Sequence, residues 1–377
     1  MSNILVIDDD HMIRVIIQRA LQNQGHQVTV AANGQEGIEQ AGKIQPALIV
    51  CDWMMPLVDG LAVCRWVKTN PDLATTFFIL LTSRGDVADR IQGLNTGADD
   101  FLPKPINLAE LQARVQAGLR LHELSQDLQT QKQLLEAELA EAAAYVQALL
   151  PVPLSGKVNI ESRFLPSRQL GGDCFDYFWL DSECLALYVL DVSGHGLGAA
   201  LPSILVMNSL RSRSLPAVDF YQPEQVLSAL NTQYQMSSQN EKYFTIWYGV
   251  YRLSDRLLTY ASAGHPPAVL IMPTSEAIPE VVQLKTPCLP IGMLDEVTFI
   301  SDRQVIPKDS TLYIFSDGIY ELSVDESQIW GLQAFVDLLA KSDCTLSLDI
   351  ILDKVQTLSQ VESFNDDLSL LRVQFKA

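Results

Sequence analysis

Acidic residues follow two short apolar runs near the start of the chain. Asp8 and Asp9 come directly after residues 4–7, and Asp52 comes directly after residues 47–51. Neighbouring carboxylates repel one another unless a cation neutralises them, and hard oxygen ligands favour Mg²⁺. A carboxylate beside such a metal can attack phosphorus and form an aspartyl-phosphate. These residue types predict a magnesium-dependent phosphoacceptor site.

Two further polar residues extend this pattern. Thr82 follows the apolar run 77–81, and Lys104 follows Phe101 and Leu102. A hydroxyl can donate a hydrogen bond to a transferred phosphoryl group, and an ammonium can neutralise its charge. Taken singly, the acids are explained by a loop or a helix N-cap, and the lysine by an ordinary surface position. The joint order favours a common site.

The elements that must position these residues alternate in type over the first 120 or so residues. Apolar runs with the length of strands occur at residues 4–7, 28–31, 47–51, 77–81 and 101–102. Helical spacing separates the first two, over residues 12–21. This alternation predicts βαβ units and a parallel sheet. The ligand crevice of such a sheet lies at the carboxyl ends of its strands, where the polar residues fall.

The first part of the chain closely resembles a response-regulator receiver domain. The resemblance rests on ILVIDDD (4–10), LIVCDWMMPLVDG (48–60), LLTS (80–83) and GADDFLPKP (97–105). It covers residues 1–120 and implies a flavodoxin-like α/β fold with a five-stranded parallel sheet. It also implies a sensor histidine kinase or another phosphodonor as a partner.

The resemblance implies a role for each polar residue of the receiver. Asp52 is the phosphoacceptor, and Mg²⁺ is held by Asp9, with help from Asp8, by Asp52 and by the backbone carbonyl of Met54. The remaining residues make up the receiver switch, in which two contact the phosphoryl group and an aromatic side chain repacks: Thr82, Lys104 and Phe101.

Residues 121–150 contain no Gly or Pro and are rich in Leu, Ala, Glu and Gln. Alternating three- and four-residue steps give a mostly apolar seam of Leu121, Leu124, Leu128, Gln131, Leu135, Glu138, Ala142, Tyr145 and Leu149. Such a seam favours a coiled coil. We therefore expect a helical coiled-coil linker over 121–151 and a homodimer through it. A single helix packed on a neighbouring domain is the alternative.

Acidic motifs also recur in the second half of the chain. They are GGD (171–173), DVSGHG (191–196), SDG (316–318) and DD (366–367). Carboxylates from distant segments, without a Cys or His ligand set, indicate Mg²⁺ or Mn²⁺ rather than zinc. Two such ions about 3.5–4 Å apart can activate a water for in-line attack on phosphorus. SDG and DD alone are common turn sequences, and GGD alone is a weak signal.

The order of these motifs resembles the SpoIIE/RsbU branch of the metal-dependent PP2C (PPM) serine/threonine phosphatases. The matching segments are GGDCFD, DVSGHGLGAAL, AGHPP, YIFSDGIYE and NDDLSLL. The resemblance covers 152–377 and implies an α+β, PP2C-like β-sandwich flanked by helices. It also implies two Mn²⁺ or Mg²⁺ ions in the phosphatase.

The same resemblance implies the catalytic metal ligands. Asp191 is shared by both ions, and the Val192 carbonyl binds one of them. Asp317 and Asp366 hold the other ion, and Asp173 binds through water.

Four further residues have lesser or alternative assignments. Arg168 lies about where some relatives carry a phosphate-binding arginine, and Asp367 falls where the superfamily usually has Asn. The spacing of His195 after Asp191 differs from the eukaryotic-type motif, so water could replace it as the acid. His265 is expected to be a turn element.

These expectations combine into a two-component response regulator. Phosphorylation of Asp52 would control hydrolysis of phosphoserine or phosphothreonine, and the resemblance points to a STAS-domain anti-anti-sigma protein as substrate. The segment 197–213 would be the switch element. The alternative is a phosphorylation-controlled adaptor with a non-catalytic phosphatase-like domain. A GGDEF cyclase is excluded because Cys174 and Phe175 follow the GGD motif.

The composition of the chain indicates which partners it binds and in which compartment it works. The chain of 377 residues has 26 Lys+Arg against 45 Asp+Glu, a net charge of −19. Nucleic-acid binding needs clustered basic groups, and an anionic membrane surface would repel this chain. The six cysteines form no C-x-x-C pair. We expect a cytoplasmic protein that binds neither nucleic acid nor membrane.

Overall fold

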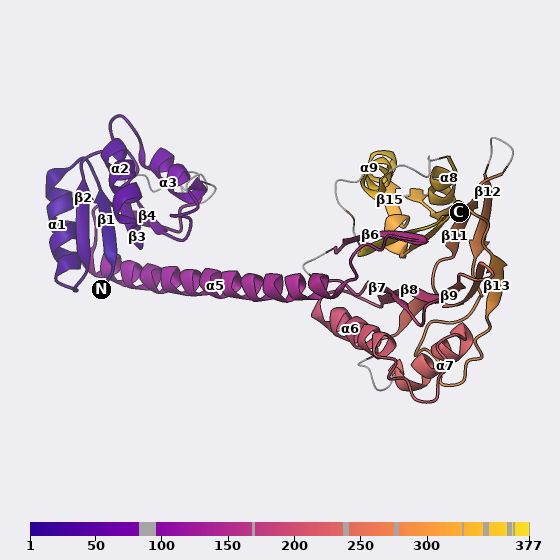
Figure 1. Ribbon diagram of the computed structural model, residues 1–377. Coiled ribbons are helices and arrows are strands. Elements are labelled where there is room, and N and C mark those ends of the chain that lie inside the picture. The colour runs from indigo at the N-terminus through magenta and orange to yellow at the C-terminus, as the bar shows by residue number, and fades with distance from the viewer. Residues whose placement is uncertain are drawn as a thin grey trace. The chain divides into compact units, whose positions relative to one another are not determined.

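The computed structural model divides into two compact units, Met1–Glu136 and Ala137–Ala377 (Figure 1). It describes residues 1–82, 96–167, 170–236, 241–274, 279–325, 328–341, 347–359, 364 and 366–376. None of the described helices combines the length and the apolar content needed to cross a bilayer.

The first unit is built on a five-stranded parallel sheet, as the alternation of apolar runs predicted. Its order is β2-β1-β3-β4-β5. The strands are β1 (Asn3–Ile7), β2 (Gln27–Ala31), β3 (Leu48–Asp52), β4 (Phe77–Thr82) and β5 (Asp100–Pro103). The described helices are α1 (His11–Gln22), α2 (Gly34–Ile44), α3 (Gly60–Thr69) and α5 (Leu108–Leu149).

Helices cover both faces of this sheet. One face packs against α1 and α5 through side chains that include Ile17, Leu111 and Val115. The other face packs against α2 and α3 through side chains that include Ala41 and Val67. A sheet buried on both faces needs apolar residues in succession, which explains why its strands appear as continuous apolar runs.

Helix α5 continues without interruption from the first unit into the predicted linker segment. Within the first unit, its His122 is buried and its Nδ1 lies 2.8 Å from the carbonyl oxygen of Thr75. Beyond this contact the middle of the apolar seam is open to solvent, with Leu128 70% exposed and Leu135 57% exposed, whereas Leu149 at its end is partly buried. The linker is therefore helical, as expected. The predicted boundaries at 120 and 151, the coiled coil and the dimer stay predictions.

The second unit is a sandwich of two antiparallel five-stranded sheets. One has the order β13-β10-β9-β8-β7 and the other β12-β11-β14-β17-β6. The first sheet contains β7 (Cys174–Trp179), β8 (Cys184–Val192), β9 (Phe244–Arg252), β10 (Leu257–Ala263) and β13 (Asp302–Val305). The second contains β6 (Val158–Leu165), β11 (Ala268–Met272), β12 (Glu280–Leu284), β14 (Ser310–Phe315) and β17 (Leu368–Phe375).

Helices flank the sandwich on its two outer faces (Figure 1). The first sheet packs against α6 and α7 through Val206 and Leu227, and the second packs against α8 and α9 through Phe335 and Ile351. The remaining elements are α6 (Leu197–Arg211), α7 (Pro223–Gln233), η2 (Asp317–Ile319), β15 (Leu322–Asp325), β16 (Gln328–Trp330), α8 (Leu332–Lys341) and α9 (Leu348–Ser359). This arrangement confirms the helix-flanked β-sandwich.

Candidate functional site

The receiver acids meet at the carboxyl ends of neighbouring strands. Strands β1 and β3 pair in parallel with Ile7 opposite Cys51, so the next residues, Asp8 and Asp52, lie side by side. One oxygen from each of Asp8, Asp9 and Asp52 lies within 4.8 Å of the others. Asp8 and Asp52 are buried and Asp9 is exposed. This separation and ligand chemistry fit a hard divalent cation.

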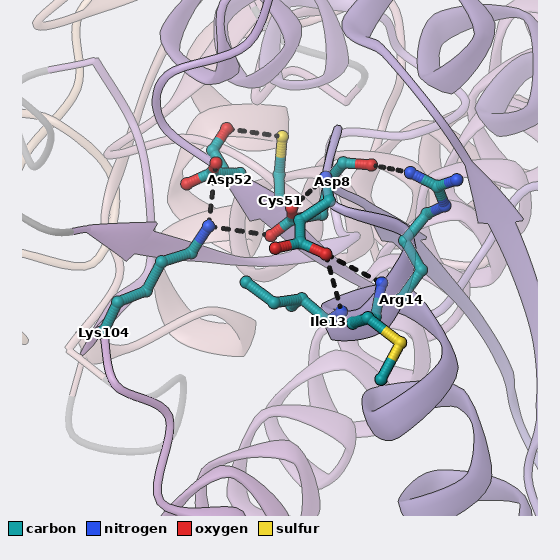
Figure 2. A network of polar contacts seen from close by, with 8 residues as sticks. Asp8, Ile13, Arg14, Cys51, Asp52 and Lys104 are labelled. Atoms are coloured by element: carbon teal, nitrogen blue, oxygen red, sulfur yellow. Dashed lines mark hydrogen bonds and ion pairs between the residues drawn. The ribbon is translucent and has the colours of Figure 1, made fainter.

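Lys104 neutralises the two buried acids (Figure 2). Its Nζ lies 2.9 Å from Asp8 Oδ2 and 2.8 Å from Asp52 Oδ2. Burial lowers the pKa of Lys104, but hydrogen bonds to Asp52 and Asp8 outweigh this effect and raise it above its ordinary value. Burial also raises the pKa of Asp52, against the opposing effect of Lys104. The ammonium therefore sits where it can also contact a group attached to Asp52.

The acidic triplet divides into separate roles. The backbone N–H of Asp10 donates a 2.8 Å hydrogen bond to Asp8 Oδ1, which fixes the Asp8 carboxylate from the side opposite Lys104. Asp10 itself caps α1 and accepts a 2.7 Å hydrogen bond from the backbone N–H of Met12. Arg14 Nη1 donates to the Asp8 carbonyl at 2.6 Å (Figure 2). The N-cap explanation thus holds for Asp10.

A glycine allows the backbone to close around Asp52. Gly60 begins α3, and its N–H donates a 2.9 Å hydrogen bond to the carbonyl of Trp53. A Cβ at this position would lie 2.2 Å from the carbonyl oxygen of Asp52. This close approach requires a residue without a side chain, which accounts for the Gly of the VDG segment.

The other receiver residues lie around the same edge. Thr82 ends β4 and is buried, and its carbonyl accepts a 2.8 Å hydrogen bond from the backbone N–H of Lys104. The ring of Phe101 lies 6.5 Å from that of Trp53, centroid to centroid. Met54 is exposed, three residues after the buried Cys51. The roles of Thr82, Phe101 and Met54 remain predictions.

In the second unit, each sheet contributes two acids. Asp173 precedes β7 and Asp191 lies near the end of β8, where Cys174 pairs with Leu190. Asp317 follows β14 and Asp366 precedes β17, and these strands are paired. Segments separated by more than a hundred residues thereby bring their carboxylates to one end of the sandwich.

The pKa values show that these carboxylates interact. Burial raises the pKa of Asp191 to about 7, and the charges of Asp317 and Asp366 add to the effect. Burial likewise raises the pKa of Asp317 to about 6, with contributions from Glu321 and Asp366. The pKa of Asp173 is raised well above its ordinary value by burial and then by Asp191. A cation among them would relieve both burial and repulsion.

The surroundings of Asp173 fit a cation or a cation-bound water. Its Oδ2 accepts a 2.6 Å hydrogen bond from Ser316 Oγ, whereas Oδ1 is buried and has no hydrogen-bond partner. A buried carboxylate oxygen is rarely left unpaired. Among the described residues, however, no three phosphatase acids bring ligand oxygens within 4.8 Å of one another. The carboxylate oxygens of the phosphatase acids are therefore farther apart than those of Asp8, Asp9 and Asp52 in the receiver.

Asp367 braces the backbone beside the acids. It is buried, and its carboxylate accepts hydrogen bonds from the N–H of Gly172 at 2.6 Å and from the N–H and Oγ of Ser167 at 2.8 and 2.9 Å. A Cβ on Gly171 would lie 2.5 Å from this carboxylate. Gly171 is therefore explained by close packing on Asp367, whereas a Cβ on Gly172 would lie 2.5 Å from the carbonyl oxygen of Val192.

The remaining predicted residues are placed as follows. Val192 is buried in β8, and His195 is exposed in the turn before α6. His265 Nδ1 lies 2.7 Å from Thr245 Oγ1, and burial lowers the pKa of His265 to about 3. This placement agrees with a structural role for His265. Arg168 lies outside the described residues.

Two residues near the acids were missed from the sequence. Ser316 hydrogen-bonds Asp173, and its place in the SDG motif was the available signal. Lys242 Nζ donates a 2.8 Å hydrogen bond to the carbonyl of Ser193, in the turn after Asp191. A lysine in a loop carries no such signal, because only the fold brings it to this turn.

Comparisons with known proteins agree with both units. The family model described as "Stage II sporulation protein E (SpoIIE)" matches residues 181–376, and the one described as "Response regulator receiver domain" matches residues 4–116. Response regulator MprA of Mycobacterium ulcerans is 44% identical over 125 residues, which are 33% of this chain and 53% of that protein. MprA of Mycobacterium leprae is 44% identical over 118 residues, which are 31% of this chain and 50% of that protein.

The chain spans about half the length of these curated relatives. Among solved structures, the SiaA-PP2C domain of Pseudomonas aeruginosa has a TM-score of 0.55 and 20% identity, covering 65% of this chain and 98% of that one. At that identity the similarity shows a common fold. Because the SpoIIE match covers more than half of the residues, the chain belongs to the SpoIIE family, with a response regulator receiver domain at its N-terminal side.

Proposed function

We propose that this protein is a metal-dependent protein phosphatase whose activity is set by phosphorylation of Asp52. The observation that carries the proposal is the gathering of Asp173, Asp191, Asp317 and Asp366 at one end of the sandwich, in mutual electrostatic contact. Membership of the SpoIIE family supports the same reaction class.

In the receiver, the chain's own residues prepare Asp52 for phosphoryl transfer. Asp8, Asp9, Asp52 and the Met54 carbonyl would hold Mg²⁺, which supplies charge neutralisation during the transfer. Lys104 would move from its contact with Asp8 and Asp52 to the new phosphoryl oxygens. Thr82 would donate a hydrogen bond to the same group. A sensor histidine kinase or another phosphodonor would supply the phosphoryl group.

In the phosphatase, Asp191 and the Val192 carbonyl would hold one metal ion, and Asp191, Asp317 and Asp366 a second. Mn²⁺ or Mg²⁺ held there would supply the charge that makes a water nucleophilic toward the phosphorus of a phosphoserine or phosphothreonine. Asp173 would orient that water by accepting a hydrogen bond at its unpaired Oδ1. Asp367 would fix the backbone at Gly172, and Ser316 would orient the carboxylate of Asp173 by its hydrogen bond.

The SpoIIE membership supports a STAS-domain phosphoprotein as the substrate. The exposed leucine seam of α5 supports a homodimer formed through this helix, because exposed leucines at alternating three- and four-residue steps gain most by pairing. Phosphorylation of the receiver would then change the pairing of α5 and, through it, the phosphatase.

The first test measures Mn²⁺-dependent phosphate release from a phosphoserine STAS protein by the full chain, with and without beryllofluoride. We expect release that requires Mn²⁺, that changes with beryllofluoride, and that falls by at least about a thousandfold in Asp191→Asn. Asp52→Ala should lose only the beryllofluoride response. Absence of turnover in a folded, Mn²⁺-binding protein would instead favour the non-catalytic adaptor.

A further inference from the structure

The exit of α5 is held on strand β7 by two separate tethers. Arg211, in the last turn of α6, donates through Nη2 to the carbonyl of Leu149 at 3.1 Å and through Nε to Asp176 Oδ2 at 2.7 Å. Tyr177, the next residue of β7, donates its hydroxyl to the carbonyl of Val152 at 2.7 Å. The carbonyl of Leu149, in the last turn of α5, is thus linked through Arg211 to Asp176. The carbonyl of Val152, just after the helix, is bonded directly to Tyr177, the next residue of the same strand.

Packing ties the same segments together. Leu149 and Leu150 pack against a core cluster that contains Cys174, Met207 and Leu210. Within this cluster, Cys174 Sγ lies 3.5 Å from Met207 Sδ of α6. Cys174 is the residue directly after Asp173. The end of α5, helix α6 and the start of β7 therefore share one core.

Electrostatics makes Arg211 the central member of this joint. Leu149 belongs to the last turn of α5, whose carbonyls lack partners within the helix, and Arg211 ends α6. The guanidinium therefore lies at the negative ends of two helices. It also neutralises Asp176, a carboxylate that is 1% exposed. A buried carboxylate without its cation is costly, so β7 would shift if Arg211 moved.

We infer that Arg211 and Tyr177 are positioning residues that make the placement of Asp173 depend on the last turn of α5. Asp173 lies three residues before Asp176 and leads directly into β7, so a displacement of β7 at Asp176 reaches it along a short extended segment. The inference rests on the proposed function, since it takes Asp173 as part of the metal site. It adds the contacts by which the linker reaches that site.

The inference is tested by reciprocity, because coupling between two sites acts in both directions. Amide hydrogen exchange of residues 140–150 is measured in the full chain with and without Mn²⁺. The test variant is R211K/Y177F, in which an ammonium still neutralises Asp176 but cannot also reach Leu149. The matched control is R213K, because Arg213 donates to the carbonyls of Trp179, the last residue of β7, and of Leu180, at the end of the strand away from Asp173.

We expect Mn²⁺ to slow exchange in residues 140–150 by about fivefold in the unmodified protein and in R213K, a modest coupling for two linked sites. In R211K/Y177F the effect should fall below about twofold. Equal protection in R211K/Y177F, or none in the unmodified protein despite Mn²⁺ binding by calorimetry, would overturn the inference alone. Failure of the unmodified protein to bind Mn²⁺ would overturn the proposed function and the inference with it.

Discussion

The backbone N–H of Gly172 donates a 2.6 Å hydrogen bond to the carboxylate of Asp367, which lies 195 residues further along the chain. This bond joins the segment before Asp173 to the segment after Asp366. It ties together the backbone segments of two different sheets that carry these two proposed metal ligands. The carboxylate of Asp367 thus stabilises the fold by accepting backbone hydrogen bonds, whereas the neighbouring carboxylates are the proposed metal ligands.

Replacing Asp367 tests this division. Asp367→Ala would leave the buried N–H of Gly172 and the N–H of Ser167 without their acceptor, at a cost of about 1–3 kcal/mol for each buried group. We expect a lower free energy of unfolding, measured by urea denaturation. The matched control is Asp255→Ala, which removes an exposed ion pair with Arg252 and should leave the free energy of unfolding nearly unchanged, because exposed ion pairs contribute little. Equal losses for the two variants would refute the bracing role.

Gly60 provides a second test, in the receiver. Gly60→Ala would place a Cβ 2.2 Å from the Asp52 carbonyl, so the backbone around the phosphoacceptor must move. We expect a loss of about 1–3 kcal/mol in stability and a weaker response to beryllofluoride. Gly42→Ala, within helix α2, is the control. Its Cβ would make an ordinary contact, 3.8 Å from the Trp66 side chain of α3. That change should stabilise by about 0.5–1 kcal/mol. Thermal unfolding of both variants measures these changes, and an unchanged melting temperature in Gly60→Ala would contradict the close approach of the backbone.

Lys104 sets the charge of the receiver site. In Lys104→Gln, the buried carboxylates of Asp8 and Asp52 lose their shared cation, so we expect Mg²⁺ to bind several-fold more tightly while the beryllofluoride response disappears. Calorimetric titration with Mg²⁺ measures the first effect. Lys68→Gln removes an ion pair with Asp99 elsewhere in the unit and should leave Mg²⁺ affinity unchanged. Weaker Mg²⁺ binding in Lys104→Gln would contradict this account.

His265 makes the stability of the second unit depend on pH. Burial lowers its pKa from 6.5 to about 3, so the unfolded chain takes up this proton more readily than the folded one. The stability from neutral His265 is present above pH 6.5 and is lost as the pH falls toward 3, by up to about 1.4 kcal/mol per pH unit. His265→Asn should flatten the pH dependence of urea unfolding of the metal-free protein. Thr245→Val retains the buried imidazole, so a flattened curve there would argue against this origin.

The exposed seam of α5 predicts self-association. Leu128→Glu places a charge at a seam position that is 70% exposed in the single chain, so it should shift sedimentation toward the monomer. Gln133→Glu adds the same charge away from the seam and should leave the dimer intact. If neither change alters sedimentation, α5 is not the dimer contact.

Much of this protein could be predicted from its sequence, because the decisive signals are local. Apolar runs ending in polar residues predicted the parallel sheet of the receiver and placed Asp8, Asp52 and Lys104 at one edge. The absence of Gly and Pro predicted the helical linker. The helix-flanked sandwich followed from a resemblance carried by motifs such as DVSGHG and SDG.

Only the tertiary structure decided which residues serve as supports. The Gly172–Asp367 bond and the contacts of Arg211 with Leu149 and Asp176 join residues far apart in the chain. No local pattern predicts such pairings, because they depend on how the two sheets and their helices pack together. Hydrogen bonding likewise separates two equally buried carboxylates: both oxygens of Asp367 accept hydrogen bonds, whereas Oδ1 of Asp173 is left unpaired. Residue type alone is the same for both, and the packed environment gives each its role.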